Sequence, residues 1–128
     1  MGLRLLVVAV LILAVGGLAG AYRLRRTRDA AIDPLALPPL PGELRSGNAT
    51  WVVFTAPYCA TCGPVRERIG RLDPTATVVE VDVADRPDLA ARYRVRTAPT
   101  VLFAGANGNI QARFVGNVPD ADLAAVRR

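Results

Sequence analysis

The sequence predicts an α/β domain with a mixed β-sheet flanked by helices, preceded by one N-terminal transmembrane helix. The helix is predicted by residues 5–21, an uncharged apolar run with the sequence LLVVAVLILAVGGLAGA. The domain is predicted from residue 50 onward, where short β-branched runs alternate with segments of helical periodicity. The last two strand-like runs flank a Gly/Asn-rich turn, which is typical of an antiparallel hairpin.

Residues 1–22 are predicted to form a transmembrane anchor that contacts the membrane through residues 3–22. A helix so uniformly apolar would need protein on every side to be buried, and the rest of the chain is too short to supply it. The alternative is a cleaved signal peptide, because residues 19–21 (AGA) have the small-x-small pattern of a cleavage site. Four arginines follow the run and oppose its translocation, which favours the anchor: Arg23, Arg25, Arg26 and Arg28.

The same four arginines predict how the anchor is oriented. Only Arg4 and the α-amino group precede the apolar run, so the positive-inside rule places the C-terminal domain in the cytoplasm. We therefore expect a single-pass protein of the cell membrane, with an outward-facing domain as the alternative. Gly16 and Gly20 have the G-x-x-x-G spacing through which two such helices can dimerise, although small residues are also common in spans without that role.

Residues 23–43 are predicted to be an Arg/Pro-rich juxtamembrane linker. Prolines at positions 34, 38, 39 and 41 disfavour helix and sheet and favour extended chain. We expect this stretch to act as a semi-rigid spacer, with a ligand for a proline-recognition domain as the alternative. The folded domain is then expected over residues 44–128.

The folded part is predicted to have the element order β-α-β-α-β-β-α. The expected strands are 50–55, 77–83, 100–103 and 110–115, and the expected helices are 59–72, 86–93 and 119–126. In the first of these helices, Val65, Ile69 and Leu72 share one face at helical spacing. A β-α-β unit followed by a hairpin predicts a sheet with both parallel and antiparallel pairs.

Composition argues against nucleic-acid binding and against a resident metal or cofactor. Residues 1–43 hold five arginines and three acids (+2), and residues 44–128 hold eleven arginines and eight acids (+3), so the globular part lacks a strong basic footprint. Two cysteines and no histidine cannot supply the four ligands of a structural zinc site. Haem attachment needs C-x-x-C-H, and residue 63 is glycine. A metal site shared across a dimer is the remaining alternative.

The two cysteines, Cys59 and Cys62, lie where the first expected strand gives way to a helix. We expect Cys59 at the helix start, where free backbone N–H groups and the helix dipole favour a thiolate. Cys62 lies three residues further, on the same side, and can close a disulfide with Cys59. A bare C-x-x-C pair can also be two small buried residues, but its position after a strand favours redox chemistry.

Two motifs together resemble those of the thioredoxin family. Residues 51–62 (WVVFTAPYCATC) resemble the family's active-site strand and motif, and residues 94–103 (RVRTAPTVLF) resemble its cis-proline loop and the strand that follows. The Asn107–Gly108 turn and Gly116 also match, so the resemblance covers residues 44–128.

This resemblance implies a membrane-tethered thiol–disulfide oxidoreductase that acts on protein dithiols or disulfides and exchanges electrons with an upstream redox partner. It implies that Cys59 is the attacking cysteine and Cys62 the resolving one. It also implies a cis Pro99 beside the disulfide, with the backbone of Ala98 accepting an extended partner strand. The sequence does not set the direction of electron flow, because the family includes both reductants and oxidants.

The chain departs from the family pattern near the cysteines. Many thioredoxins carry a buried Asp where this chain has Val53, and our hypothesis is that Glu80 on the next strand supplies the carboxylate that takes the resolving thiol's proton. The alternative is that Glu80 points to solvent. Tyr58 stands where Trp is usual, and Pro64 comes earlier than the family's helix proline and is expected to kink the helix near its start. The family's N-terminal strand and helix are short or missing, which predicts a minimal fold.

A second function class remains open: a non-catalytic binding or assembly module on a thioredoxin scaffold at the membrane. The absence of the buried Asp favours it. Arg92, Arg94 and Arg96 precede Pro99 and are expected to raise the local potential, which favours a thiolate and acidic partners. The alternative for these three arginines is a solvated basic surface.

Overall fold

The computed structural model describes the backbone of residues 1–30 and 32–126 and the side chains of residues 1–25 and 32–126. The chain divides into two compact units, Met1–Ala31 and Ile32–Arg128. Each unit is described by itself below.

The first unit is a single helix, α1 (Gly2–Ala30), which extends past the expected end of the anchor at residue 22. The segment Gly2–Arg25 contains an 18-residue stretch with a mean hydropathy of 2.5 and is long and apolar enough to cross a membrane, by length and composition alone. The helix continues through Arg23 and Arg25 because arginine favours helix and no proline occurs before position 34. The side chains of Arg26 and Arg28 lie outside the described residues.

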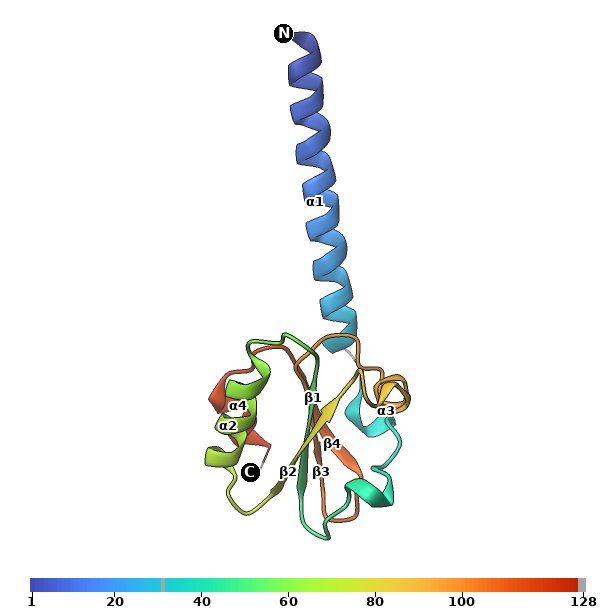
Figure 1. The fold of residues 1–128 in the computed structure, drawn as a ribbon, viewed down its shortest axis with the longest axis vertical. Helices are drawn as coiled ribbons and strands as arrows, with labels where there is room; N and C mark the ends of the chain where they lie inside the picture. Colours follow the sequence, from blue (N-terminus) through green and yellow to red (C-terminus); the bar gives the residue numbers. More distant parts are fainter. Residues whose placement is uncertain (31, 127–128) are drawn as a thin grey trace. The chain divides into compact units, whose positions relative to one another are not determined.

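The second unit is built on a four-stranded sheet with the strand order β2-β1-β3-β4 (Figure 1). The strands are β1 (Thr50–Thr55), β2 (Thr77–Asp82), β3 (Thr100–Ala104) and β4 (Ile110–Val115). β1 pairs in parallel with β2, and β1–β3 and β3–β4 are antiparallel. The predicted mixed sheet is therefore confirmed.

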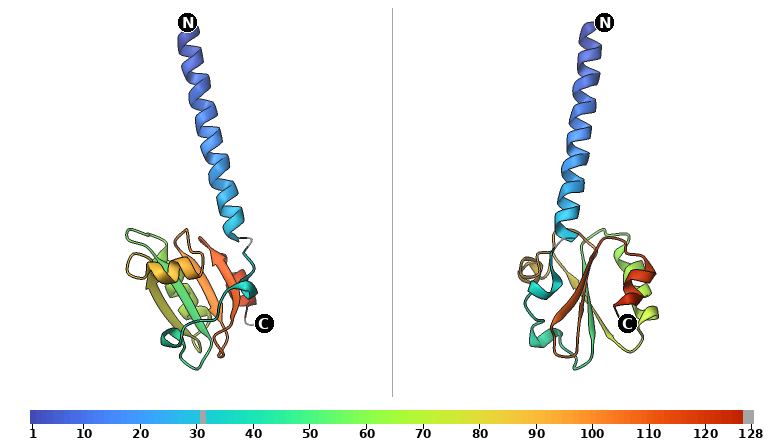
Figure 2. Two further views of the ribbon diagram at one scale, coloured as in Figure 1. Left: turned by 90° about the vertical axis from the view of Figure 1, so that its right-hand side faces the viewer. Right: turned by 180° about the vertical axis from the view of Figure 1, so that it is seen from behind.

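Helices cover both faces of this sheet (Figures 1 and 2). α2 (Cys62–Leu72) and α4 (Asp120–Ala125) lie on one face. The other face carries α3 (Pro87–Arg92) and a segment with two 3₁₀ turns, η1 (Pro34–Ala36) and η2 (Gly42–Leu44). The order of elements after residue 49 is the predicted β-α-β-α-β-β-α.

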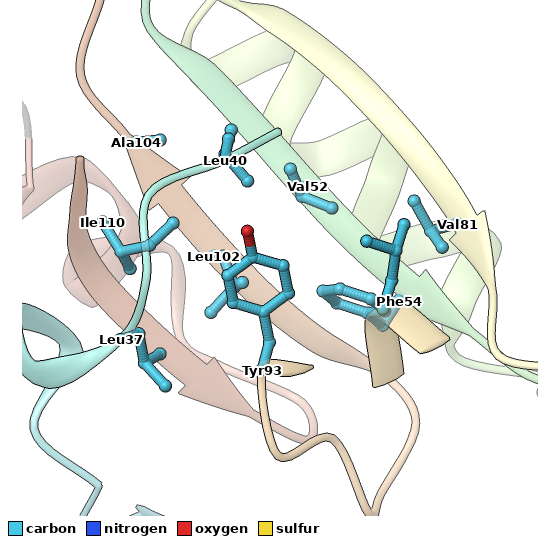
Figure 3. Close-up of a cluster of buried hydrophobic side chains, with 10 residues drawn as sticks. Leu37, Leu40, Val52, Phe54, Val81, Tyr93, Leu102, Ala104 and Ile110 are labelled. Atoms are coloured by element: carbon cyan, nitrogen blue, oxygen red, sulfur yellow. The ribbon is translucent and has the colours of Figure 1, made fainter. Parts of the chain in front are cut away.

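The central strand β1 divides the apolar core into two parts. All six of its residues are buried, as expected for a strand covered on both faces. Because side chains alternate along a strand, Trp51 and Val53 pack toward α2 and α4. Val52 and Phe54 pack on the opposite face, where they join Tyr93 (Figure 3).

The structure differs from the expected linker between residues 32 and 43, because this stretch forms part of the domain core. Leu37 and Leu40 are 8% and 1% exposed and lie beside Tyr93 in Figure 3. The backbone N–H of Leu40 donates to the Gly108 carbonyl, and the Tyr93 hydroxyl donates to the Pro39 carbonyl at 2.9 Å. The prolines do block helix and sheet, but the leucines between them still supply apolar surface that covers the sheet.

Candidate active site

The cysteine motif lies in the connection between β1 and α2. The structure corrects one expectation here, since α2 begins at Cys62 rather than at Cys59. Cys59 lies in the preceding turn, where its N–H donates to the Ala56 carbonyl at 3.2 Å. Pro64 explains this start, because proline lacks an N–H and fits only the first turn of a helix. A helix from residue 59 would place Pro64 in its interior.

Cys59 and Cys62 are joined by a disulfide, with their Cα atoms 5.6 Å apart. Their exposure differs: Cys59 is partly exposed, whereas Cys62 is 5% exposed and packs at the start of α2. The Thr61 hydroxyl oxygen lies 3.7 Å from the Cys59 sulfur. A helix N-terminus presents backbone N–H groups and a partial positive charge, which stabilise a thiolate beside it. Because Cys59 is the more exposed of the two, an incoming protein reaches its sulfur more easily than the sulfur of Cys62.

Pro99 lies at the same end of the sheet as the cysteine loop. Phe54 pairs with Thr100 in the antiparallel β1–β3 ladder, so Pro99 lies across from the last residue of β1. The Ala98–Pro99 peptide bond is cis, and Pro99 is buried. Its carbonyl accepts a 2.8 Å hydrogen bond from the N–H of Gly116. The β-strand pairing thus places the cysteine loop and the Pro99 loop at the same end of the sheet.

The structure also corrects the expectation of a buried carboxylate at Glu80. Its side chain is 44% exposed and pairs with Nη1 of Arg66 on α2 at 2.9 Å. Its neighbour in the β1–β2 register, Val53, is fully buried. Glu80 stays accessible because β2 is an edge strand of the described sheet, so one side of it is not covered by another strand.

Two features of the loops at this end were not expected from the sequence. Tyr58, directly before Cys59, has φ +62° and a fully exposed side chain. Arg94, in the loop before Pro99, has φ +54°. A non-glycine residue in this left-handed region is uncommon, and in the described residues these two are the only ones. The described residues contain no cluster of His, Cys, Asp or Glu that would hold a metal ion.

Comparison with known proteins identifies the family. The thioredoxin family model matches residues 43–127, which includes the cysteine loop, the Pro99 loop and the whole sheet. The chain belongs to the thioredoxin family. Its thioredoxin domain is 32% identical over 85 residues to thioredoxin from Mycoplasmoides gallisepticum, an alignment that covers 63% of this chain and 84% of that protein.

Two further similarities agree with this assignment. Thioredoxin from Pyropia yezoensis is 32% identical over 78 residues, covering 58% of this chain and 72% of that protein. The structure of a variant thioredoxin from Halobacterium salinarum superposes with a TM-score of 0.58 at 25% identity, covering 66% of this chain and 76% of that one. A thioredoxin domain with a C-x-x-C cysteine pair is a thiol–disulfide oxidoreductase, and this chain is one.

Proposed function

We propose that the chain is a membrane-tethered oxidoreductase that exchanges protein disulfides, with Cys59 as the attacking and Cys62 as the resolving cysteine. The observation that carries this assignment of roles is the difference in exposure between the two bonded sulfurs. Cys59 lies in an accessible turn, and Cys62 is buried at the start of α2. An extended partner can approach the first sulfur while the second stays shielded until the mixed disulfide forms.

Reduction of a substrate then takes two exchange steps. The Cys59 thiolate attacks one sulfur of a substrate disulfide, a new S–S bond forms, and the other substrate sulfur leaves as a thiolate. The Cys62 thiolate next attacks the Cys59 sulfur, which releases the first substrate sulfur as a thiolate. The substrate has gained two electrons, and the protein has lost two and holds the Cys59–Cys62 disulfide. An upstream dithiol partner restores the reduced pair, and the same steps in reverse oxidise a substrate dithiol.

We assign Pro99 and Ala98 to substrate binding beside the disulfide. Pro99 directly precedes β3 at the end of the sheet where the cysteine loop emerges, and its carbonyl already accepts a hydrogen bond from the N–H of Gly116. The backbone of Ala98 therefore stands at the start of a strand, where an extended peptide can pair with it as an added strand. The Glu80 carboxylate has no part in this proposal, because it lies at the surface with Arg66.

Membrane tethering is supported by α1, whose segment Gly2–Arg25 has the length and composition of a span. A signal sequence has the same properties, and the basic residues that follow the apolar run favour the anchor. The cytoplasmic orientation of the domain and a dimer through Gly16 and Gly20 stay predictions. The orientation is tested by treating whole cells with a reductant and then with a membrane-impermeant thiol reagent. Labelling of Cys59 in intact cells indicates an outward-facing domain, and labelling only after lysis indicates a cytoplasmic one.

The activity is tested by the reduction of insulin with dithiothreitol, followed as turbidity. We expect the full chain in detergent to accelerate the reaction and Cys59→Ser to abolish the acceleration. Cys62→Ser should accumulate a mixed disulfide through Cys59, which mass spectrometry identifies. A wild type without activity, or equal trapping through Cys62 in Cys59→Ser, contradicts the proposal. The first of these results favours the non-catalytic binding module instead.

A further inference from the structure

Arg94 holds a backbone position at which glycine is the usual residue. It follows the C-cap of α3, where the N–H of Val95 donates to the Ala90 carbonyl at 2.8 Å and the N–H of Arg94 donates to the Ala91 carbonyl at 3.2 Å. This bond pair is a Schellman motif, whose left-handed residue is here Arg94 with φ +54°. A side chain at such a φ costs free energy that glycine avoids. The chain therefore carries an arginine where folding alone favours glycine.

Packing does not explain this arginine. Arg94 is exposed, and its guanidinium takes part in none of the hydrogen bonds or ion pairs of the described residues. It lies in the loop that leads from α3 to Pro99, and that loop ends at the same end of the sheet as the cysteine loop. Backbone strain gathers at functional sites, where a side chain is kept for what it contacts in a partner.

The stretch of chain around Arg94 is basic. Residues 89–119 contain four arginines and no Asp or Glu, and residues 56–61 carry no charge. Arg113 on β4 donates from Nη2 to the Arg94 carbonyl at 3.0 Å, which brings a second guanidinium to this loop. On the other side of β1, Asp82 ends β2 and Asp85 follows it. Positive charge thus gathers on the connection from α3 to β3, and negative charge on the end of β2 and the residues after it.

We propose that Arg94 is a specificity-determining residue that selects protein disulfides flanked by Asp or Glu. This inference rests on the proposed disulfide exchange through Cys59. An exposed rim charge acts on a charged partner mainly through the association rate, and salt screens the effect. Acidic side chains beside the substrate disulfide would lie toward the β3 side, next to Arg94 and away from Asp85.

The test compares two peptide disulfides of equal length that carry either Glu or Lys next to the cysteines. The full chain is reduced in detergent, and the second-order rate constant for each peptide is measured at low and high salt. We expect the wild type to favour the Glu peptide at low salt and to lose that preference as salt rises. Arg94→Gln should lower the Glu/Lys rate ratio roughly two- to fivefold, and Arg94→Lys should keep it. Arg71→Gln, at the far end of α2, is the matched control and should leave the ratio unchanged.

Arg94→Gly separates selection from a structural role. Glycine suits φ +54°, so this variant should melt at a higher temperature than the wild type while losing the preference for the Glu peptide. A wild-type rate ratio near one, or a ratio that Arg94→Gln leaves unchanged, overturns the inference and leaves the proposed function intact. Absence of exchange with both peptides instead overturns the proposed function.

Discussion

The indole Nε1 of Trp51 donates a 2.8 Å hydrogen bond to Oδ2 of Asp73, and the two residues are only 1% and 4% exposed. Asp73 is the C-cap of α2, and its Oδ1 also accepts from the Thr75 hydroxyl at 3.1 Å. This contact ties the end of α2 to the first half of β1. It therefore helps to hold the helix whose other end carries Cys62.

Removal of this carboxylate should destabilise the domain. Asp73→Ala leaves the buried indole N–H of Trp51 without its acceptor, which costs about 1–3 kcal/mol in the free energy of unfolding. Trp51 is the chain's single tryptophan, so its fluorescence reports both the local change and denaturant unfolding. Asp85→Ala, at an exposed position, is the control and should stay within about 0.5 kcal/mol of the wild type. Equal losses in both variants would contradict the importance of the buried bond.

Tyr93 should make the stability of the domain fall at alkaline pH. Burial raises the pKa of its hydroxyl above the usual value of 10.0. The nearby positive charges of Arg92 and Arg45 lower the pKa, but by less than burial raises it. The neutral hydroxyl is thus favoured in the folded state, so its contribution is complete below about pH 10 and is lost as pH rises through the folded pKa. Denaturant unfolding between pH 8 and pH 12 measures this loss.

The matched variant is Tyr93→Phe, which removes the titrating group and the 2.9 Å bond to the Pro39 carbonyl. We expect it to lower the free energy of unfolding by about 1 kcal/mol at neutral pH and to flatten the alkaline decline. Tyr58→Phe serves as the control, because Tyr58 is fully exposed. A wild-type profile that Tyr93→Phe reproduces at every pH would rule out this residue as the source.

A substitution at Gly108 tests how the segment around Leu40 is held, and a substitution at Gly70 serves as its control. Gly108 has φ +84°, and a Cβ there would clash with the side chain of Arg45, whose Nε donates to the Leu40 carbonyl at 2.6 Å. Gly108→Ala should therefore cost more than about 1 kcal/mol of stability. Gly70→Ala, in α2 with open space around the added Cβ, should instead stabilise by about 0.5–1 kcal/mol. Thermal unfolding of the two variants in opposite directions is the expected result.

The strands and the sheet were predictable because their signals are local. β-branched runs mark β1 and β2, the Gly/Asn turn marks the β3–β4 hairpin, and the helix that connects β1 to β2 is the crossover that a parallel pair requires. The cysteine motif was also predictable, since its residue types and spacing stand in the sequence. The start of α2 at Cys62 was within reach as well, because Pro64 restricts where that helix begins.

The remaining features depend on tertiary context that no local pattern carries. Prolines conceal the apolar spacing of Leu37 and Leu40, so the segment has the composition of a linker although it packs as core. The left-handed backbone of Arg94 depends on where α3 ends. The β1–β2 register sets Glu80 beside Val53, but whether that position is buried depends on which strand forms the sheet edge.

The exposed position of Glu80 leads to a prediction about proton transfer. The Arg66–Glu80 pair is about half exposed on both sides, and surface pairs of this kind contribute about 0–1 kcal/mol. Glu80→Gln should therefore leave the rate of mixed-disulfide resolution within about twofold of the wild type, and Arg66→Gln should behave alike. Acid quenching followed by mass spectrometry measures the release of substrate from Cys59. A tenfold slower release in Glu80→Gln, with Arg66→Gln unchanged, would show that the Glu80 carboxylate does accept the Cys62 proton despite its place at the surface.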